Sequence, residues 1–183
     1  MPTVDELTAG YGNFMLSPRR APGVCTTCFN LTAGYSRCYA CSHCESWLDA
    51  VAPISYSVAH EQLHHALACY KRLGGAAARK VRTELAAVLW RHLAAHERCV
   101  AAGSISGEFQ IVTTVPAGTT ERDANQPLRR IVAELVQPVR NRYQRLLERS
   151  EAPAQPRAFD ARRFSARTRL RGEAILLIDD TWT

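Results

Sequence analysis

Apolar residues recur at helical spacing in two segments of the first half of the chain. In the first segment they fall on one face: Leu63, Ala66, Leu67 and Tyr70. Gly74 and Gly75 interrupt this pattern, and a longer one then continues until it fades near Gly103. The many Ala and Arg residues of the second segment also favour helix. The sequence therefore predicts two successive helices.

Short apolar runs without helical spacing predict the strands. Residues 110–115 indicate a buried strand that ends at Pro116, and residues 174–178 indicate a strand buried on both faces. Residues 51–58 form a further β-like run, and a short irregular strand is expected within residues 158–164. These runs supply the strands of the expected sheet.

The segments between these strands are helical or polar. Residues 117–125 form a polar loop, and a helix is expected from Pro127 through Leu135, with Pro138 ending or kinking it. Residues 139–150 are ambiguous between helix and strand. Because strand and helix patterns alternate, we predict an α/β fold with a mostly parallel sheet.

Composition divides the chain into three parts. Residues 1–23 are expected to form a flexible leader, because glycines and prolines such as Gly10 and Pro18 break any periodicity. Residues 24–50 form a small cysteine-rich module. Residues 51–183 form the α/β domain.

Cysteines concentrate in the module, where they form two CxxC pairs: Cys25, Cys28, Cys38 and Cys41. Two such pairs can offer four thiolates to one tetrahedral zinc ion, and a site of that kind is closed and structural. Cys44 leaves an alternative open, because Cys41 and Cys44 could form the second pair in place of Cys38. His43 is a further candidate ligand. A thioredoxin-like redox role needs only one CxxC pair in another fold context, so zinc is the favoured interpretation.

The two isolated cysteines lie outside the module. Cys69 and Cys99 fall within the predicted helices, away from the CxxC pairs. Free cysteines often behave as small apolar side chains in protein interiors. We therefore expect both to be buried.

The chain is basic, with a formal net charge of +6. Arginine supplies nearly all of the positive charge, since lysine occurs only at Lys71 and Lys80. Guanidinium groups bind phosphate oxygens in pairs, which predicts an anionic partner, either a phosphorylated metabolite or nucleic acid.

Targeting signals are not evident in the sequence. The first residues include Asp5 and Glu6 and lack the basic-then-apolar run of an export signal. No apolar stretch approaches the roughly 18 residues that a membrane span needs. We therefore expect a cytoplasmic protein with no membrane partner.

Two carboxylates follow the last predicted strand. Asp179 and Asp180 emerge at its carboxyl end, the edge where open α/β sheets bind ligands, and no cationic residue is next to them in the sequence. They could accept hydrogen bonds from a sugar diol or hold Mg²⁺ through oxygen. Thr181 and Thr183 could bind a phosphate. No GxxxxGK[ST] loop precedes them, which excludes a P-loop NTPase.

These motifs together resemble a known family. The segment from Ile175 to Thr183 resembles the signature with which type I phosphoribosyltransferases bind phosphoribosyl pyrophosphate (PRPP). With the cysteine pairs and the segments PISYS and QLHHALACYK, the chain from about residue 24 onward resembles the competence-protein ComF family. The resemblance implies a type I phosphoribosyltransferase fold with an N-terminal zinc module. The implied reaction transfers a phosphoribosyl group and releases pyrophosphate.

The resemblance also implies roles for individual residues. Asp179 and Asp180 would bind the ribose hydroxyls of PRPP, and Thr181 and Thr183 would open the loop that holds its 5′-phosphate, with Mg²⁺ bound alongside PRPP. Arg122 would be the cation on the pyrophosphate side. Members of the family often have Arg-Gly-Phe/Tyr-Asn-Gln here, whereas residues 122–126 keep only the Arg and the Asn-Gln.

The chain stops within the expected phosphate loop. We therefore expect an incomplete sheet and a fragment that binds PRPP weakly by itself. Two alternatives stay open: a competence-type protein that handles nucleic acid through the zinc module and the basic surface, and a PRPP-sensing regulator without catalysis. Neither the acceptor substrate nor the oligomeric state follows from the sequence.

Overall fold

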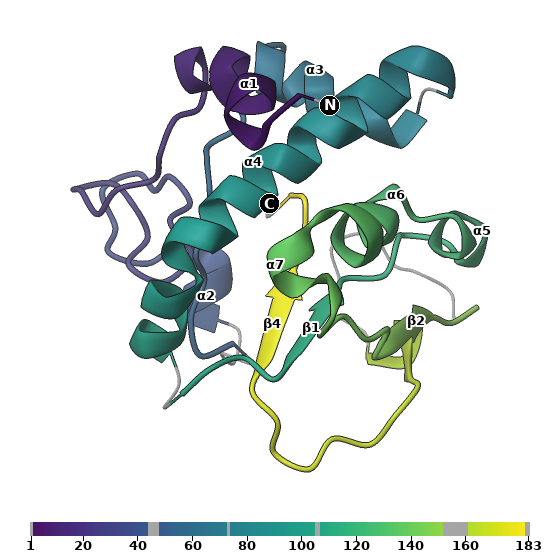
Figure 1. The fold of residues 1–183 in the computed structure, drawn as a ribbon. Coiled ribbons are helices and arrows are strands. Elements are labelled where there is room, and N and C mark those ends of the chain that lie inside the picture. Colours follow the sequence, from purple (N-terminus) through teal and green to yellow (C-terminus); the bar gives the residue numbers. More distant parts are fainter. Residues whose placement is uncertain (1, 44–47, 73, 105–106, 152–160, 182–183) are drawn as a thin grey trace.

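The computed structural model describes residues 2–43, 48–72, 74–104, 107–151 and 161–181. The chain is a mixed α/β protein in which helices outnumber strands (Figure 1). Its helices are α1 (Val4–Thr8), η1 (Ala9–Asn13), α2 (Tyr39–His43), α3 (Gln62–Arg72), α4 (Gly75–Ser104), α5 (Thr120–Ala124), α6 (Pro127–Arg130), η2 (Ile131–Leu135), α7 (Gln137–Arg140) and η3 (Ala161–Arg163). Its strands are β1 (Ile111–Thr114), β2 (Leu147–Arg149), β3 (Phe164–Ala166) and β4 (Ile175–Ile178).

Helix α4 is the longest element and crosses the molecule (Figure 1). It packs against α1 and α3 and also against η2 and α7. The helical spacing of the sequence predicted both α3 and α4, and both predictions are confirmed. Among the described helices, none combines the length and the hydropathy of a membrane span.

The sheet is small and divided. Strands β1 and β4 pair in parallel, from Ile111 opposite Ile175 to Thr114 opposite Ile178, whereas β2 and β3 form a separate antiparallel pair. The expected parallel sheet is therefore present only as two strands in the described part of the chain. The prediction that β4 is buried on both faces is wrong, because Leu177 is 39% exposed and, of the four strand residues, only Ile178 is buried.

The run at residues 51–58 is not a strand. Its one sheet-like contact is an isolated bridge, in which the Tyr56 N–H donates to the Leu16 carbonyl over 2.8 Å. The prediction failed because β propensity needs a neighbouring strand to pair with, and among the described residues only Leu16 forms a backbone bridge with this segment. Residues 158–160 of the expected irregular strand lie outside the described residues, residues 161–163 form η3, and β3 begins at Phe164.

The leader contains regular structure, against expectation. Thr3 caps α1 with a capping box to Glu6, and Tyr11 is buried with its hydroxyl donating to Glu84 of α4 over 3.1 Å. Arg91 of α4 donates to Thr8 over 3.0 Å. Contacts with α4, which the local sequence pattern does not reveal, stabilise this segment.

The segment around the prolines folds into three short helical pieces. Pro127 occupies the first turn of α6, as expected. The chain then forms the π-helix η2 and leaves helical geometry at Val136 before α7, so Pro138 lies in the first turn of a new helix. The ambiguous residues 139–150 contain the end of α7 and then β2.

The hydrophobic core forms where these elements meet. Its fully buried members come from α3, β1, η2, α7 and the turn before α7: Tyr70, Val112, Val132, Val136 and Val139. The other buried members are Ala86 and Leu93 of α4, Leu128 of α6, Ile131 of η2 and Ile178 of β4. The core therefore holds β1 and β4 against α4.

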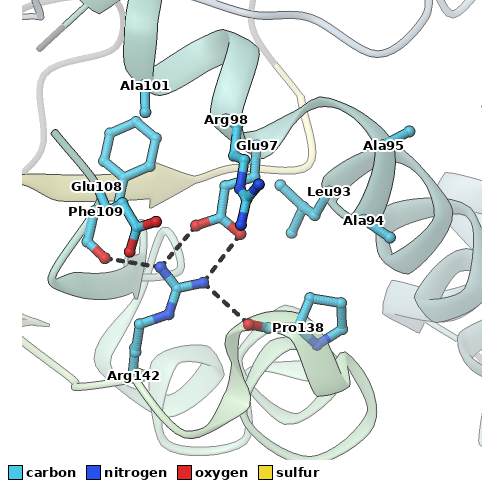
Figure 2. A pocket seen from close by; sticks show the side chains of 10 residues that line it. All are labelled: Leu93, Ala94, Ala95, Glu97, Arg98, Ala101, Glu108, Phe109, Pro138 and Arg142. Atoms are coloured by element: carbon cyan, nitrogen blue, oxygen red, sulfur yellow. Dashed lines mark hydrogen bonds and ion pairs between the residues drawn. The ribbon is translucent and has the colours of Figure 1, made fainter.

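Arg142 ties α4 to the segment after α7 (Figure 2). Its guanidinium group makes a bidentate ion pair with Glu97, at 2.6 and 3.0 Å. The same group donates to the carbonyls of Phe109 and Pro138, at 2.7 and 3.0 Å. Arg142 and these three partners line part of a cleft of about 410 Å³.

Replacing this arginine should destabilise the protein. In Arg142→Met, the Glu97 carboxylate, only 17% exposed, and two carbonyls lose their donor, so we expect the free energy of unfolding to fall by about 2 kcal/mol. Urea denaturation measures the change. The control is Arg167→Met, because Arg167 pairs with Glu148 on the surface, where a loss of at most about 0.5 kcal/mol is expected. Equal losses in the two variants would contradict this assignment.

Candidate functional site

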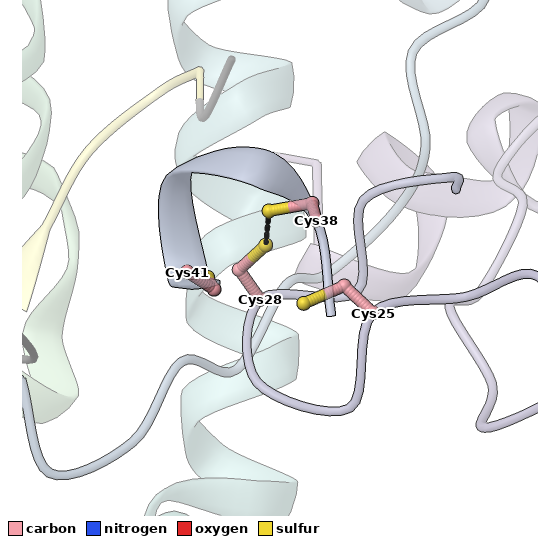
Figure 3. A group of neighbouring side chains, drawn as sticks. All are labelled: Cys25, Cys28, Cys38 and Cys41. Atoms are coloured by element: carbon pink, nitrogen blue, oxygen red, sulfur yellow. Dashed lines mark hydrogen bonds between the residues drawn. The ribbon is translucent and has the colours of Figure 1, made fainter. Parts of the chain in front are cut away.

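The two CxxC pairs converge on one point (Figure 3). The sulfur atoms of Cys25, Cys28, Cys38 and Cys41 all lie within 4.8 Å of one another. The Sγ atoms of Cys28 and Cys38 are 3.6 Å apart, well beyond the roughly 2.05 Å of a disulfide. A tetrahedral zinc ion with Zn–S bonds of about 2.3 Å needs sulfurs about 3.8 Å apart. The cluster therefore fits a metal ion such as zinc.

Local backbone geometry presents the first pair. The Cys25 N–H donates to the Asn30 carbonyl over 2.8 Å, and the Phe29 N–H donates back to the Cys25 carbonyl over 3.0 Å. This tight turn forces Phe29 to a positive φ of 64°. The Tyr56 hydroxyl donates to the Phe29 carbonyl over 2.7 Å and fastens the turn to the rest of the protein.

The second pair lies at the start of α2. Cys38 precedes this helix, its carbonyl accepts the Ser42 N–H over 3.0 Å, and Cys41 follows one turn later. His43 stacks on Tyr39 and its Nδ1 lies 2.9 Å from the Tyr39 carbonyl. The structure therefore brings together the four cysteines that the CxxC spacing predicted, whereas Cys44, the alternative ligand, lies outside the described residues.

The electrostatic surroundings of the thiols differ. Burial opposes ionisation of Cys25, but backbone N–H groups of Cys28, Cys38 and Thr27 outweigh it and lower the pKa of Cys25 to about 6. Burial raises the pKa values of Cys28 and Cys41. A metal ion would supply the positive charge that stabilises the remaining thiolates.

The isolated cysteines have separate environments. Cys69 is half-buried, and Cys99 is exposed. The prediction that Cys99 is buried is therefore wrong, because its position on α4 faces solvent rather than the core.

A second candidate site lies at the carboxyl edge of the parallel pair. Thr114 ends β1 and lies opposite Ile178, which ends β4, so the segments after both strands leave the sheet at the same edge. Asp179, Asp180 and Thr181 follow β4 directly. Thr183 lies outside the described residues.

Two residues of α3 reach this edge, and the sequence pattern did not assign them a role there. The Tyr70 hydroxyl donates to Asp180 Oδ2, and the Lys71 Nζ lies 2.7 Å from Asp180 Oδ1. The acids thus have a cationic neighbour in space, although none is next to them in sequence. Only the packing of α3 against α4 and β4 brings these residues together.

Asp179 differs from its neighbour in its surroundings. Its carboxylate reaches solvent, and its Oδ1 accepts the Asp180 N–H over 2.8 Å. Partial desolvation raises the pKa of Asp179, and the negative charge of Asp180 adds to the effect. Asp179 is therefore easier to protonate than a fully solvated aspartate.

The segment after β1 carries Arg122, the cation expected on the pyrophosphate side. Arg122 lies exposed on α5 and, within the described residues, its guanidinium group makes no hydrogen bond or ion pair. The next residue, Asp123, is 2% exposed and accepts hydrogen bonds from Arg145, at 2.7 Å, and from the Arg149 N–H, at 3.1 Å. Asp123 thus connects α5 to β2 and to the segment before it.

Arg129 and Arg145 lie near Tyr143, which contacts the end of β1. Both lie close enough to Tyr143 to lower its pKa, although burial raises that pKa overall, and the Tyr143 hydroxyl lies 3.0 Å from Thr114 Oγ1. Sequence reasoning missed them because they come from α6 and from the segment before β2. No local motif marks either one.

Comparisons with protein-family models, with curated proteins and with solved structures found no match to this chain.

Metal binding at the cysteine cluster is directly testable. We expect the purified protein to carry about one zinc ion per chain by plasma mass spectrometry, and Cys25→Ser to lose it, because the variant has only three thiolates for a tetrahedral ion. A strong chelator should lower the melting temperature of the wild-type protein. The control is Cys99→Ser, since Cys99 is exposed and lies outside the cluster. Zinc content that is unchanged in Cys25→Ser would rule out this site.

Proposed function

We propose that the chain is a phosphoribosyltransferase-like protein that binds PRPP at the edge where β1 and β4 end, with the cysteine cluster as a structural zinc site. The observation that carries this proposal is the parallel pairing of Thr114 with Ile178. It brings the acidic segment after β4 beside the segment after β1. Open α/β sheets bind ligands at this edge.

The chemistry of the edge supports an anionic sugar ligand. Carboxylates accept hydrogen bonds from ribose hydroxyls, and the Thr181 hydroxyl can contact a phosphate. Lys71 lies beside Asp180, and Arg129 lies near Tyr143, whose hydroxyl contacts Thr114 at the end of β1. This mixture of acids and cations suits a molecule that carries a diol and phosphate groups.

In the proposed reaction a nucleophile attacks C1 of the ribose, and the bond from C1 to the pyrophosphate oxygen breaks. The transition state is oxocarbenium-like, so the protein accelerates the reaction by holding both partners in place and by stabilising charge. Asp179 would hold the ribose, and Arg122 and Arg129, which follow β1, would attract the departing pyrophosphate. Mg²⁺, when bound with PRPP, neutralises charge on the pyrophosphate.

The cysteine cluster has a supporting role in this proposal. Four thiolates would close the coordination sphere of a zinc ion and leave no position for a substrate. Tyr56 connects the cluster to the segment that leads into α3. A bound metal would therefore stabilise the fold rather than take part in the reaction.

Binding of PRPP tests the proposal. Calorimetric titration of the full-length protein with PRPP and Mg²⁺ should show saturable binding, and Asp179→Asn should weaken it by about 10-fold or more, because a charged acceptor is lost. Glu173→Gln is the matched control, since it removes one carboxylate at the opposite end of β4. Absence of binding by the wild-type protein, or equal binding by both variants, would contradict the proposal.

Nucleic acid is a second candidate partner, favoured by one observation on the cysteine module. Tyr35 and Tyr39 are 73% and 79% exposed on either side of Arg37, and residues 7–44 contain no carboxylate side chain. Aromatic rings beside basic residues can stack on unpaired bases. Fluorescence anisotropy should show salt-sensitive binding of single-stranded oligonucleotides, reduced several-fold in Tyr35→Ser/Tyr39→Ser. Unchanged binding in this variant, with Tyr11→Phe as control, would exclude the module as the binding surface.

A further inference from the structure

The two adjacent acids at the end of β4 have different partners. Asp180 is almost fully engaged: its Oδ2 accepts the Tyr70 hydroxyl, and its Oδ1 accepts Lys71 Nζ over 2.7 Å and the Thr181 hydroxyl over 2.9 Å. Its side chain is 16% exposed. The three donors leave a ligand hydroxyl at most one acceptor position, on Oδ2, of a carboxylate that is mostly covered by protein.

Tyr70 makes the engagement of Asp180 hard to reverse. The ring belongs to the hydrophobic core and is 1% exposed, so its hydroxyl is withdrawn from water and needs an acceptor inside the protein. Burial raises the pKa of Tyr70, and the neighbouring charge of Asp180 adds to this, which keeps the hydroxyl a donor. Releasing Asp180 would leave a buried hydroxyl unpaired, at a substantial cost in free energy.

Asp179 accepts no hydrogen bond from a side chain of the described residues. Its carboxylate is exposed, and the described residues give it only backbone N–H donors, from Asp180 and Thr181. Oxygen lone pairs of this group therefore remain available to a ligand.

We infer that Tyr70 and Lys71 act as positioning residues that clasp Asp180 and hold the segment after β4 in place, so that Asp179 alone of the two acids contacts the ligand. The assignment of the ligand as a ribose phosphate rests on the proposed function. The clasp itself rests only on the contacts of Asp180. It joins the last turn of α3 to the end of β4 across the core.

Lys71 adds charge balance to this arrangement. Its ammonium group neutralises Asp180, so the acid pair presents one net negative charge, located on Asp179. The same Nζ lies 3.5 Å from Thr181 Oγ1, which places a cation beside the start of the expected phosphate segment. The side chain of Lys71 is 42% exposed, so this ion pair contributes less to stability than the buried bond from Tyr70.

A double-mutant cycle on thermal unfolding tests the clasp without any ligand. Tyr70→Phe and Asp180→Ala should each lower the melting temperature by about 3 to 8 °C, and the double variant should lose clearly less than the sum, because either change alone already removes the bond between Tyr70 and Asp180. Tyr11→Phe is the matched control: its hydroxyl also donates to a carboxylate, Glu84, so its effect should add to that of Asp180→Ala. Asp179→Ala should change the melting temperature by less than about 2 °C.

A second measurement separates positioning from mere stabilisation. In Tyr70→Phe and Lys71→Met, the amide resonances of Asp179, Asp180 and Thr181 should shift or broaden, and Lys71→Arg should restore them, because it keeps the positive charge. PRPP titration of the same variants should then show weakening of several-fold in Lys71→Met and loss of binding in Asp179→Ala.

The outcomes distinguish the inference from the proposed function. If the wild-type protein does not bind PRPP but the cycle shows coupling between Tyr70 and Asp180, the proposed function is wrong and the inferred clasp on Asp180 is supported. If PRPP binds and Asp180→Ala weakens it at least as much as Asp179→Ala, while the melting temperatures of the two variants agree, the division of roles is overturned. Additive effects of Tyr70→Phe and Asp180→Ala would overturn the clasp itself.

Discussion

The parallel pairing of β1 with β4 is the constraint on which the rest of the α/β part depends. The two strands are separated by about sixty residues of chain, and a parallel connection requires the intervening segment to cross from one end of the sheet to the other. The α5–α7 region and the β2–β3 pair make that crossing. Because Val112 and Ile178 are both buried against α4, the register that aligns the strand ends is also the one that fills the core.

Helix α4 connects the strand pair to the remainder of the molecule, because elements from both halves of the chain pack against it. One side of it receives η2 and α7, with Arg142 bonded to Glu97, and another side receives α1 and α3. Tyr11 and Arg91 bond the N-terminal helices to it. The position of α3 in turn delivers Tyr70 and Lys71 to the end of β4. Helix packing at the centre and chemistry at the sheet edge are thus connected through one helix.

The cysteine cluster is stabilised in a different way from the α/β domain. Its four sulfurs are brought together by tight turns and by a short helix rather than by a hydrophobic core, which a segment of about twenty residues is too short to build. Backbone N–H groups around Cys25 favour the thiolate, and a metal ion would provide the missing attraction between the two halves. The module is therefore a small unit whose stability depends on ligation, attached to a domain whose stability depends on packing.

The sequence by itself determined the features that depend on local spacing. The CxxC pairs predicted which four cysteines converge, apolar periodicity predicted α3 and α4, and the apolar runs before Pro116 and Asp179 predicted β1 and β4. Each of these signals lies within a few turns of chain, where propensity and periodicity act directly.

Only the tertiary structure decided which residues meet from distant segments. The local pattern around Tyr56 predicts a strand, yet among the described residues no second strand pairs with it. Residues 1–23 contain several glycines and prolines, yet part of this segment is helical because it packs against α4. In the sequence Asp179 and Asp180 are two equivalent acids. In the structure only Asp180 accepts a hydrogen bond from Tyr70, which lies more than a hundred residues earlier. Such contacts depend on long-range packing, and no local pattern in the sequence encodes them.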